Sequence, residues 1–335
     1  MRLHKDNPRI EIRMSTIEVF SKQSDYIGEG PLWSVAEQAL YWIDIGRKRL
    51  HRKRLSESRS RSWRLPDYPG CLAELVSPRS LAIAMAEGVY QMDLISGAAE
   101  LLCAGPTRSP GIRFNDGKAD SRGRLWVGTM QNNFGPAGEE NPVDRRDGVL
   151  YRFDTDGHVA ILEDGIGIPN TLAWSPNLKR FYFGDSLKGH IYVYDFNAYS
   201  GTICNKRTFF DGPGYGGPDG SAIDVDGCLW NARWDGSAVL KITPEGTIDR
   251  IIELPVPRPT SCSFGGCDLK TLFVTSATYG LTGAQLEHSP LSGSVFAIPG
   301  AGQGIAVPPM AYRQRGDVAI AAEGAWRDNQ SPNRR

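Results

Sequence analysis

The segment Pro31-Leu-Trp-Ser-Val-Ala-Glu-Gln-Ala-Leu-Tyr-Trp-Ile-Asp44 has the pattern of one strand, a tight turn and a second strand. The same pattern returns along the whole chain, and the copies begin near residues 31, 71, 115, 170, 219 and 260. In most copies a third strand-like run follows, such as residues 148–153. A repeat of about 40 to 55 residues with three or four strands per unit is typical of a β-propeller.

We therefore expect a single all-β domain, a six-bladed β-propeller over residues 16–300. Residues 16–21 read as an outer strand that closes the last blade, and no long stretch has a helical period. Residues 1–15 are then an N-terminal extension, and residues 301–335 a tail that we expect to be frayed. Two packed sandwiches are the alternative, but they would not explain a repeat that spans the chain.

The composition excludes several classes of protein. Lys plus Arg and Asp plus Glu both number 38, so the net charge of zero argues against binding to nucleic acid or to an anionic membrane. No run approaches the length of a membrane span, and the polar start lacks the apolar stretch of a signal peptide. Six cysteines without CxxC spacing indicate reduced thiols, so we expect a cytoplasmic protein. We also expect a monomer or a small homo-oligomer. The basic run over residues 47–64 is interpreted as a solvated blade face.

Four polar residues open their copies of the repeat at nearly the same position. Each precedes the aromatic residue of its second strand by 11 to 13 residues, and the four are Glu29, Asn115, Asn170 and Asp219. Near-equal positions in related blades place these side chains at one height around the central axis. The alternative is that each one caps a turn between blades, where Asn and Asp are common. The shared register of the set favours convergence on one point.

Two carboxylates and two carboxamides that converge form an oxygen-rich cage, which suits a divalent cation. Without a cation the buried carboxylates would repel each other and carry the cost of desolvation. We therefore expect one divalent cation as cofactor, and Ca, Mg, Mn, Fe(II) and Zn all remain open.

At these residues the sequence resembles the SMP-30/gluconolactonase/luciferin-regenerating (regucalcin-like) family, which includes the bacterial sugar lactonases. The motifs cover the chain in order from about residue 25 to residue 300. They are Gly28-Glu-Gly-Pro-Leu-Trp33, Arg113-Phe-Asn-Asp-Gly-Lys-Ala-Asp120, Asn170-Thr-Leu-Ala-Trp-Ser-Pro176, Pro218-Asp-Gly220 and Pro259-Thr-Ser-Cys-Ser-Phe-Gly-Gly266.

The resemblance implies a six-bladed propeller with one metal ion in the mouth of its tunnel. By resemblance, Glu29, Asn170 and Asp219 are the protein ligands of that metal. The usual Asn-Gly of the family reads Asn170-Thr171 here, which keeps the ligand and alters its surroundings.

The resemblance also assigns substrate contacts. Arg113 and Asn115 match the residues that hold the sugar lactone. The polar stretch 131–148 is longer than a hairpin requires, so it reads either as a lid at the mouth or as a solvated insertion. In some relatives a carboxylate of this loop touches the substrate, and Glu139 and Glu140 are both candidates.

We expect metal-dependent hydrolysis of an aldonolactone to the aldonic acid, with Asp219 as the general base that accepts the proton of the attacking water. One alternative is a non-catalytic, calcium-binding regulatory propeller. Another is an enzyme with the same metal site that acts on non-sugar esters. No GxSxG motif or paired zinc-type histidine spacing is present, which argues against a serine hydrolase or a classical zinc protease.

Overall fold

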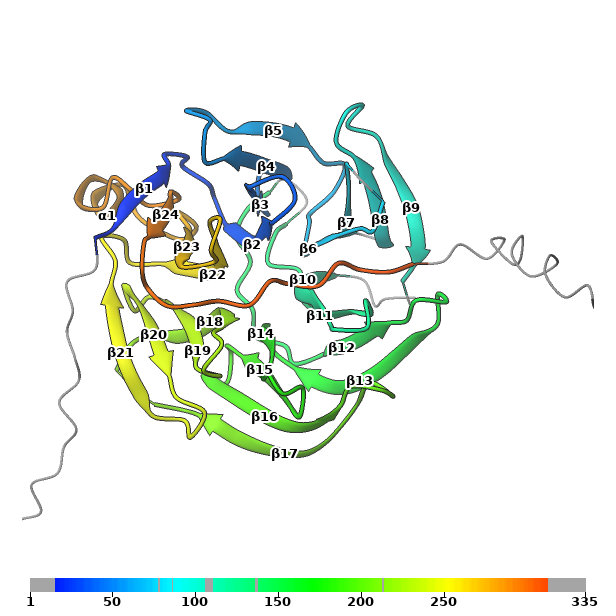
Figure 1. The fold of residues 1–335 in the computed structure, drawn as a ribbon. Coiled ribbons are helices and arrows are strands. Elements are labelled where there is room, and N and C mark those ends of the chain that lie inside the picture. The colour runs from blue at the N-terminus through cyan, green and yellow to red at the C-terminus, as the bar shows by residue number, and fades with distance from the viewer. Residues whose placement is uncertain are drawn as a thin grey trace, which may run out of the picture.

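The structure, a computed structural model, describes residues 16–312 apart from residues 78, 86, 106–110, 136–137 and 213. These residues form six four-stranded antiparallel sheets around a central axis, as Figure 1 shows. The all-β prediction and the six-bladed propeller are therefore confirmed. The boundaries predicted for the two terminal segments remain predictions, and residues 1–15 lie outside the described residues.

The blades follow the chain. Blade 1 contains β2 (Gly28–Ser34), β3 (Ala39–Asp44), β4 (Arg49–Arg54) and β5 (Arg61–Arg64). Blade 2 contains β6 (Cys71–Glu74), β7 (Ser80–Met85), β8 (Gly88–Asp93) and β9 (Ala99–Ala104). Blade 3 contains β10 (Ile112–Ala119), β11 (Leu125–Gln131), β12 (Gly148–Phe153) and β13 (Val159–Ile166).

The second half repeats this order. Blade 4 contains β14 (Pro169–Trp174), β15 (Arg180–Asp185), β16 (His190–Asn197) and β17 (Thr202–Phe210). Blade 5 contains β18 (Gly217–Ile223), β19 (Leu229–Trp234), β20 (Ala238–Ile242) and β21 (Ile248–Glu253). Blade 6 contains β22 (Pro259–Gly265), β23 (Thr271–Ser276), β24 (Val295–Ile298) and, from the other end of the chain, β1 (Glu18–Ser21). The predicted closure by residues 16–21 is thus confirmed.

Within the described part of the chain, one short helix interrupts the strands. The helix α1 (Gly283–His288) has a capping box, in which the Thr282 side chain accepts from the Gln285 amide and Gln285 reaches back. No buried residue lies on it, so it adds little to the core. Among the described residues, no helix is both long and apolar enough to cross a membrane.

Aromatic side chains fill the space between blades. Trp33 of blade 1 stacks on Phe273 of blade 6 with ring centroids 5.3 Å apart, and Trp126 of blade 3 meets Trp174 of blade 4 at 5.5 Å. Trp230 of blade 5 is fully buried. The interpretation of these tryptophans as core between blades is confirmed.

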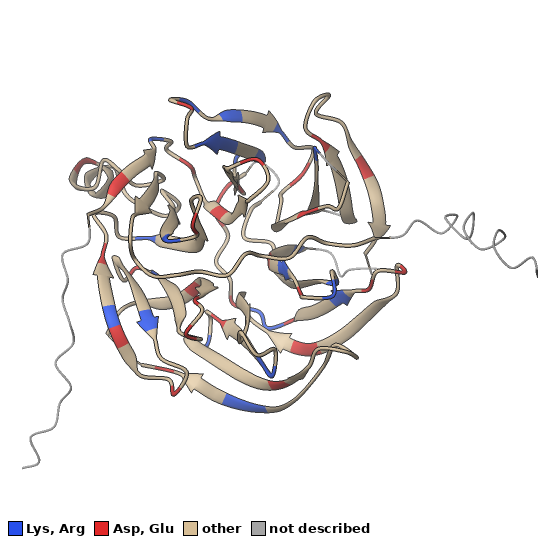
Figure 2. Cartoon of the chain, in the orientation of Figure 1, with Lys and Arg blue, Asp and Glu red and all other residues tan. Residues whose placement is uncertain are grey.

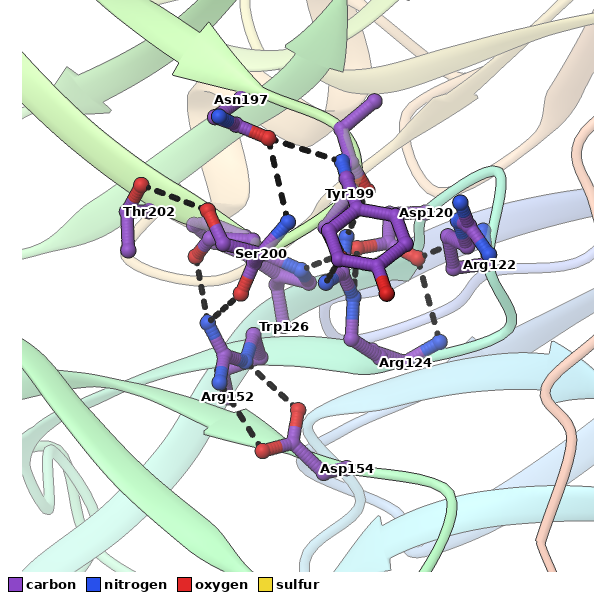
Figure 3. Close-up of polar contacts among 12 residues, drawn as sticks. Asp120, Arg122, Arg124, Trp126, Arg152, Asp154, Asn197, Tyr199, Ser200 and Thr202 are labelled. Carbon is purple, nitrogen blue, oxygen red and sulfur yellow. Dashed lines mark hydrogen bonds and ion pairs between the residues drawn. The ribbon is translucent and has the colours of Figure 1, made fainter.

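Blades 3 and 4 are also joined by arginines, as Figure 3 shows. Arg124, held by Asp120 at 2.6 Å, donates to the carbonyl oxygens of Ala198 and Tyr199 in the turn between β16 and β17. Arg152 donates to the carbonyl oxygen of Ser200 in the same turn. These bonds fix the blades at the end of the propeller where the inner strands finish.

Residues 301–312 lie across that same end (Figure 1). The segment bonds to blades 5 and 6 near Gly304, and the Met310 amide donates to the Glu74 carbonyl of blade 2. Met310 is completely buried. The expectation of a frayed tail is therefore wrong for residues 301–312, because backbone hydrogen bonds and one anchoring side chain hold them in place.

The basic run lies on the outer strands β4 and β5 of blade 1, where Figure 2 shows lysine and arginine close together. Arg52 pairs with Glu57 at 2.7 Å, and Lys53 lies over the ring of Phe20. This location agrees with an outer blade face.

Candidate functional site

A cavity of about 410 Å³ opens at the end of the propeller where the inner strands begin. The first residues of β2, β10, β14 and β18 point into it. Their side chains include all four that share the repeat register: Glu29, Asn115, Asn170 and Asp219 line the cavity, and each is at most 8% exposed. The structure therefore brings together the four residues that the sequence pattern selected.

Hydrogen bonds connect the amides of this group. The Asn115 side-chain nitrogen lies 3.2 Å from Asn170 Oδ1, and Asn170 donates to the hydroxyl of Ser186 at 2.8 Å. Arg113 donates to Asn115 Oδ1 at 2.8 Å. The amides are thus oriented by neighbours from blades 3 and 4.

The two carboxyl groups each accept a backbone amide, from Gly30 at Glu29 and from Gly220 at Asp219, but they also crowd each other. Glu29 and Asp219 share a hydrogen bond, and burial raises the pKa of Glu29 to about 8, with the Asp116 charge adding to the effect. Burial and then the Glu29 charge hold the pKa of Asp219 well above its usual range. Both carboxyl groups therefore gain from a positive charge between them.

A second layer of charge lies deeper in the tunnel. Asp116 accepts from the Gly117 amide at 2.8 Å, and Lys118 donates to the carbonyl oxygen of Ser221 at 2.8 Å. Burial raises the pKa of Asp116 and lowers that of Lys118. Because the first residue is an acid and the second a base, the charges of this layer partly offset each other. The guanidinium groups of Arg113 and Arg233 are the positive charges that act on Glu29 and Asp219, and the pKa values of both carboxyl groups stay raised in spite of them.

The donor set fits a divalent cation. Among the described residues, no three side chains of His, Cys, Asp or Glu gather around one point. The set at the tunnel mouth instead combines two carboxylates, Glu29 and Asp219, with the amide oxygen of Asn170. Hard cations prefer oxygen ligands of this mixed kind.

The strands bend where they carry these residues. The pairing register shifts between Glu29 and Leu32 in β2 and between Asn170 and Ala173 in β14, which marks a bulge in each strand. In β2 the bulge contains Gly30 with φ 55°, whereas in β14 it contains Thr171 with φ 57°.

A β-branched residue is strained in the left-handed region, so Thr171 requires compensation. Its hydroxyl donates to the Asp219 carbonyl oxygen at 2.5 Å, and Asn231 donates to the Thr171 hydroxyl at 3.1 Å. Thr171, which stands where the family usually has glycine, thus links the strand of Asn170 to the strand of Asp219.

The long loop between β11 and β12 reaches over the cavity. Its Asn133 accepts from Arg113 Nε at 2.8 Å, and Phe134 stacks on Tyr68 of the β5–β6 connection with centroids 4.5 Å apart. The loop also contributes Asn141 and Val143 to the cavity wall. This position agrees with a lid.

The two candidate glutamates of this loop are not among the residues that line the cavity. Glu140 accepts from the hydroxyl of Tyr26 and from the Gly280 amide, the latter at 2.9 Å. The carbonyl of Glu139 accepts from the Gly135 amide within the loop. Glu140 therefore fastens the loop to the β1–β2 connection and to the segment between β23 and α1. Direct substrate contact by either glutamate remains a prediction.

Sequence reasoning missed several wall residues. Asn133, Ser186, Trp234 and Tyr279 line the cavity and were not selected. Ser186 and Trp234 lie at the turns that leave the second strands of blades 4 and 5, a position that the repeat could have indicated. Asn133 lies within a loop and has no such signal.

Comparison with known proteins gives a consistent result. The family model of the SMP-30/Gluconolactonase/LRE-like region matches residues 27–278. A 6-deoxy-6-sulfogluconolactonase of Pseudomonas putida is 37% identical over 84% of this chain and 94% of its own length. Regucalcin of Bos taurus is 34% identical over 88% of this chain and 98% of its own length. A crystal structure described as a calcium-binding protein, regucalcin, of Agrobacterium tumefaciens superimposes with a TM-score of 0.82 at 29% identity, and covers 88% of this chain and 97% of that one.

Proposed function

Because this chain belongs to the SMP-30/gluconolactonase/LRE-like family and is a hydrolase of the lactonase type, we propose that it opens a sugar (aldono-) lactone to the aldonic acid with one divalent cation. The observation that carries the proposal is the buried pair Glu29 and Asp219 at the base of an open cavity. Two buried acids that share a hydrogen bond gain from a cation between them, and an open cavity above them gives a substrate access to it.

Glu29, Asn170 and Asp219 would hold the cation, for which Ca, Mg, Mn, Fe(II) and Zn remain candidates. A divalent cation bound there supplies positive charge that polarises an ester carbonyl and lowers the pKa of water. Glu29 and Asp219 are each held from both neighbouring residues. For Asp219 these contacts are Ser186 at the Pro218 carbonyl and the Gly220 amide at the carboxylate. We assign to it the role of general base that accepts the proton of the attacking water.

The remaining residues position the substrate. Arg113, which keeps one terminal nitrogen clear of its bonds to Phe114, Asn115 and Asn133, faces the cavity and would bind lactone hydroxyls together with Asn115. The lid residues Asn141 and Val143 would exclude bulk water above the ring. Fixing the ring in this way aligns the carbonyl for attack.

The test is lactone hydrolysis with and without metal. Protein freed of metal by chelation should lose turnover of aldonolactones in a pH-drop assay, and one of the candidate cations should restore it. The panel should contain gluconolactone, a pentonolactone, a 6-deoxy-6-sulfo analogue and simple aryl esters, with the spontaneous rate subtracted. Full activity in a preparation verified to be free of metal would overturn the cation's role.

The regucalcin relatives favour a second candidate, a calcium-binding propeller without catalysis. It predicts tight calcium binding and no turnover on any member of the panel. Turnover of aryl esters alone would instead identify an enzyme of non-sugar esters. The cytoplasm remains the proposed location, since the six cysteines are all free thiols.

A further inference from the structure

The backbone carbonyls next to the three proposed cation ligands share an unusual feature. The backbone carbonyl of the residue before each ligand accepts a hydrogen bond from a side chain of a neighbouring blade. The three bonds are Thr260 Oγ1 to the Gly28 carbonyl at 2.5 Å, Asn115 Nδ2 to the Pro169 carbonyl at 2.9 Å and Ser186 Oγ to the Pro218 carbonyl at 2.5 Å.

These bonds cross between blades at the same level. Thr260 joins blade 6 to blade 1, Asn115 joins blade 3 to blade 4, and Ser186 joins blade 4 to blade 5. Elsewhere the blades meet through aromatic and aliphatic contacts, which are not directional, and through further hydrogen bonds such as those of Arg124 and Lys118, which do not act on the residue before a ligand. A directional bond one residue from a ligand therefore fixes the height of that ligand's strand relative to its neighbour.

Thr260 is neither a proposed cation ligand nor a residue of the cavity wall. It lies at the start of β22, the inner strand of blade 6, which contributes no proposed ligand, and it does not line the cavity. It is completely buried, and its hydroxyl lies 2.9 Å from that of Thr275 in the same blade. At Gly28 a Cβ atom would come within 2.7 Å of the Ser276 carbonyl oxygen, so glycine there allows blade 6 to approach the strand of Glu29.

We propose that Thr260 is a positioning residue for Glu29, and that Ser186 does the same for Asp219. The hydroxyl of Thr260 holds the Gly28 carbonyl, and this sets the place of the Glu29 carboxylate opposite Asp219. The inference rests on the proposed cation site, because only a site with several ligands from different blades needs such accuracy. Metal sites lose affinity by about 10- to 100-fold when groups that orient their ligands are removed.

The experiment compares two buried threonines that contact each other. Thr260→Val removes the hydroxyl that reaches blade 1, and Thr275→Val removes a hydroxyl that contacts Thr260 and Ser261 within blade 6. Metal-free proteins are titrated with Ca²⁺ and with Mn²⁺ by calorimetry, and their thermal unfolding is recorded without metal. We expect Thr260→Val to weaken cation binding by about 10-fold or more and Thr275→Val to leave it within about twofold.

Two further variants distinguish a loss of positioning from misfolding. Thr260→Ser keeps the hydroxyl and should restore the wild-type affinity, and Ser186→Ala should weaken binding as Thr260→Val does. Equal affinity in wild type and Thr260→Val, or equal losses in Thr260→Val and Thr275→Val, would overturn the positioning role. A wild-type protein that binds neither cation would instead remove the proposed function on which the inference rests.

Discussion

The two ends of the central tunnel use the same residue types for different purposes. In blade 5, Asp219 lies near the start of the inner strand and Asp224 follows its end, and both are buried. Asp224 accepts from the Trp230 indole at 2.9 Å and from the Cys228 amide at 2.8 Å. Asp219 instead faces Glu29. A buried carboxylate whose oxygens accept hydrogen bonds from neighbouring donors indicates a structural role. A buried carboxylate that faces a second acid indicates a metal ligand or a catalytic residue.

The ends also differ in how they are closed. The β11–β12 loop lines part of the cavity at the Asp219 end, while residues 301–312 cross the Asp224 end. Beneath that segment lies a smaller cavity of about 170 Å³ with walls that include Trp174 and Phe264. The comparison therefore predicts that substitutions at the first end affect turnover and those at the second affect stability.

The largest effect should follow from Asp219→Asn. The amide cannot accept the water proton as the carboxylate does, so we expect kcat to fall by about 100-fold or more. Metal-free stability should not fall, because one of two crowded acids is removed. Asp224→Asn in the same blade is the matched control and should lower the melting temperature while folded protein keeps its kcat. Near-normal kcat in Asp219→Asn would exclude it as the base.

The next effect concerns the opposite end. Met310→Ala removes a completely buried side chain, which should lower the free energy of unfolding by about 2–5 kcal/mol. Measured well below the melting temperature, kcat/KM should be unchanged. Ile305→Ala on the same segment is the control, since Ile305 is 38% exposed and should cost much less. A large loss of kcat/KM in folded Met310→Ala would show that the two ends are coupled.

A pH dependence should separate the ends further. In metal-free protein the folded state keeps a proton on Glu29 up to about pH 8, while the unfolded chain loses it near the usual value of 4.5. The free energy of unfolding should therefore fall as pH rises from about 4.5 to 8, and Glu29 should contribute at most about 1.4 kcal/mol per unit to this slope. Glu29→Gln should reduce the slope and leave the part due to Asp219 and Asp116, whose pKa values burial also raises, and saturating divalent cation should reduce it as well. An unchanged slope in Glu29→Gln would place its origin elsewhere.

The sequence predicts the first end of the tunnel much better than the second. The repeat places Glu29 and Asp219 because inner strands of related blades begin at one height. The sequence does not predict the position of residues 301–312, because their contacts are mainly backbone hydrogen bonds, which leave no pattern of side chains in the sequence. Thr260 escapes for another reason, since threonine is ordinary in a strand and its partner Gly28 lies 232 residues away.

The smallest effect should come from the β11–β12 loop at the first end. Glu140 ties this loop to Tyr26 and Gly280, and a net hydrogen bond is worth about 0.5–1.5 kcal/mol. Glu140→Gln and Tyr26→Phe should therefore each raise KM by about 2- to 10-fold with little change in kcat, because the loop closes less often over a bound lactone. Asp144→Asn on the same loop is the control and should leave both constants near wild type. A fall in kcat with KM unchanged would instead favour direct contact of Glu140 with the reacting lactone, since an interaction lost only in the transition state lowers turnover and not binding.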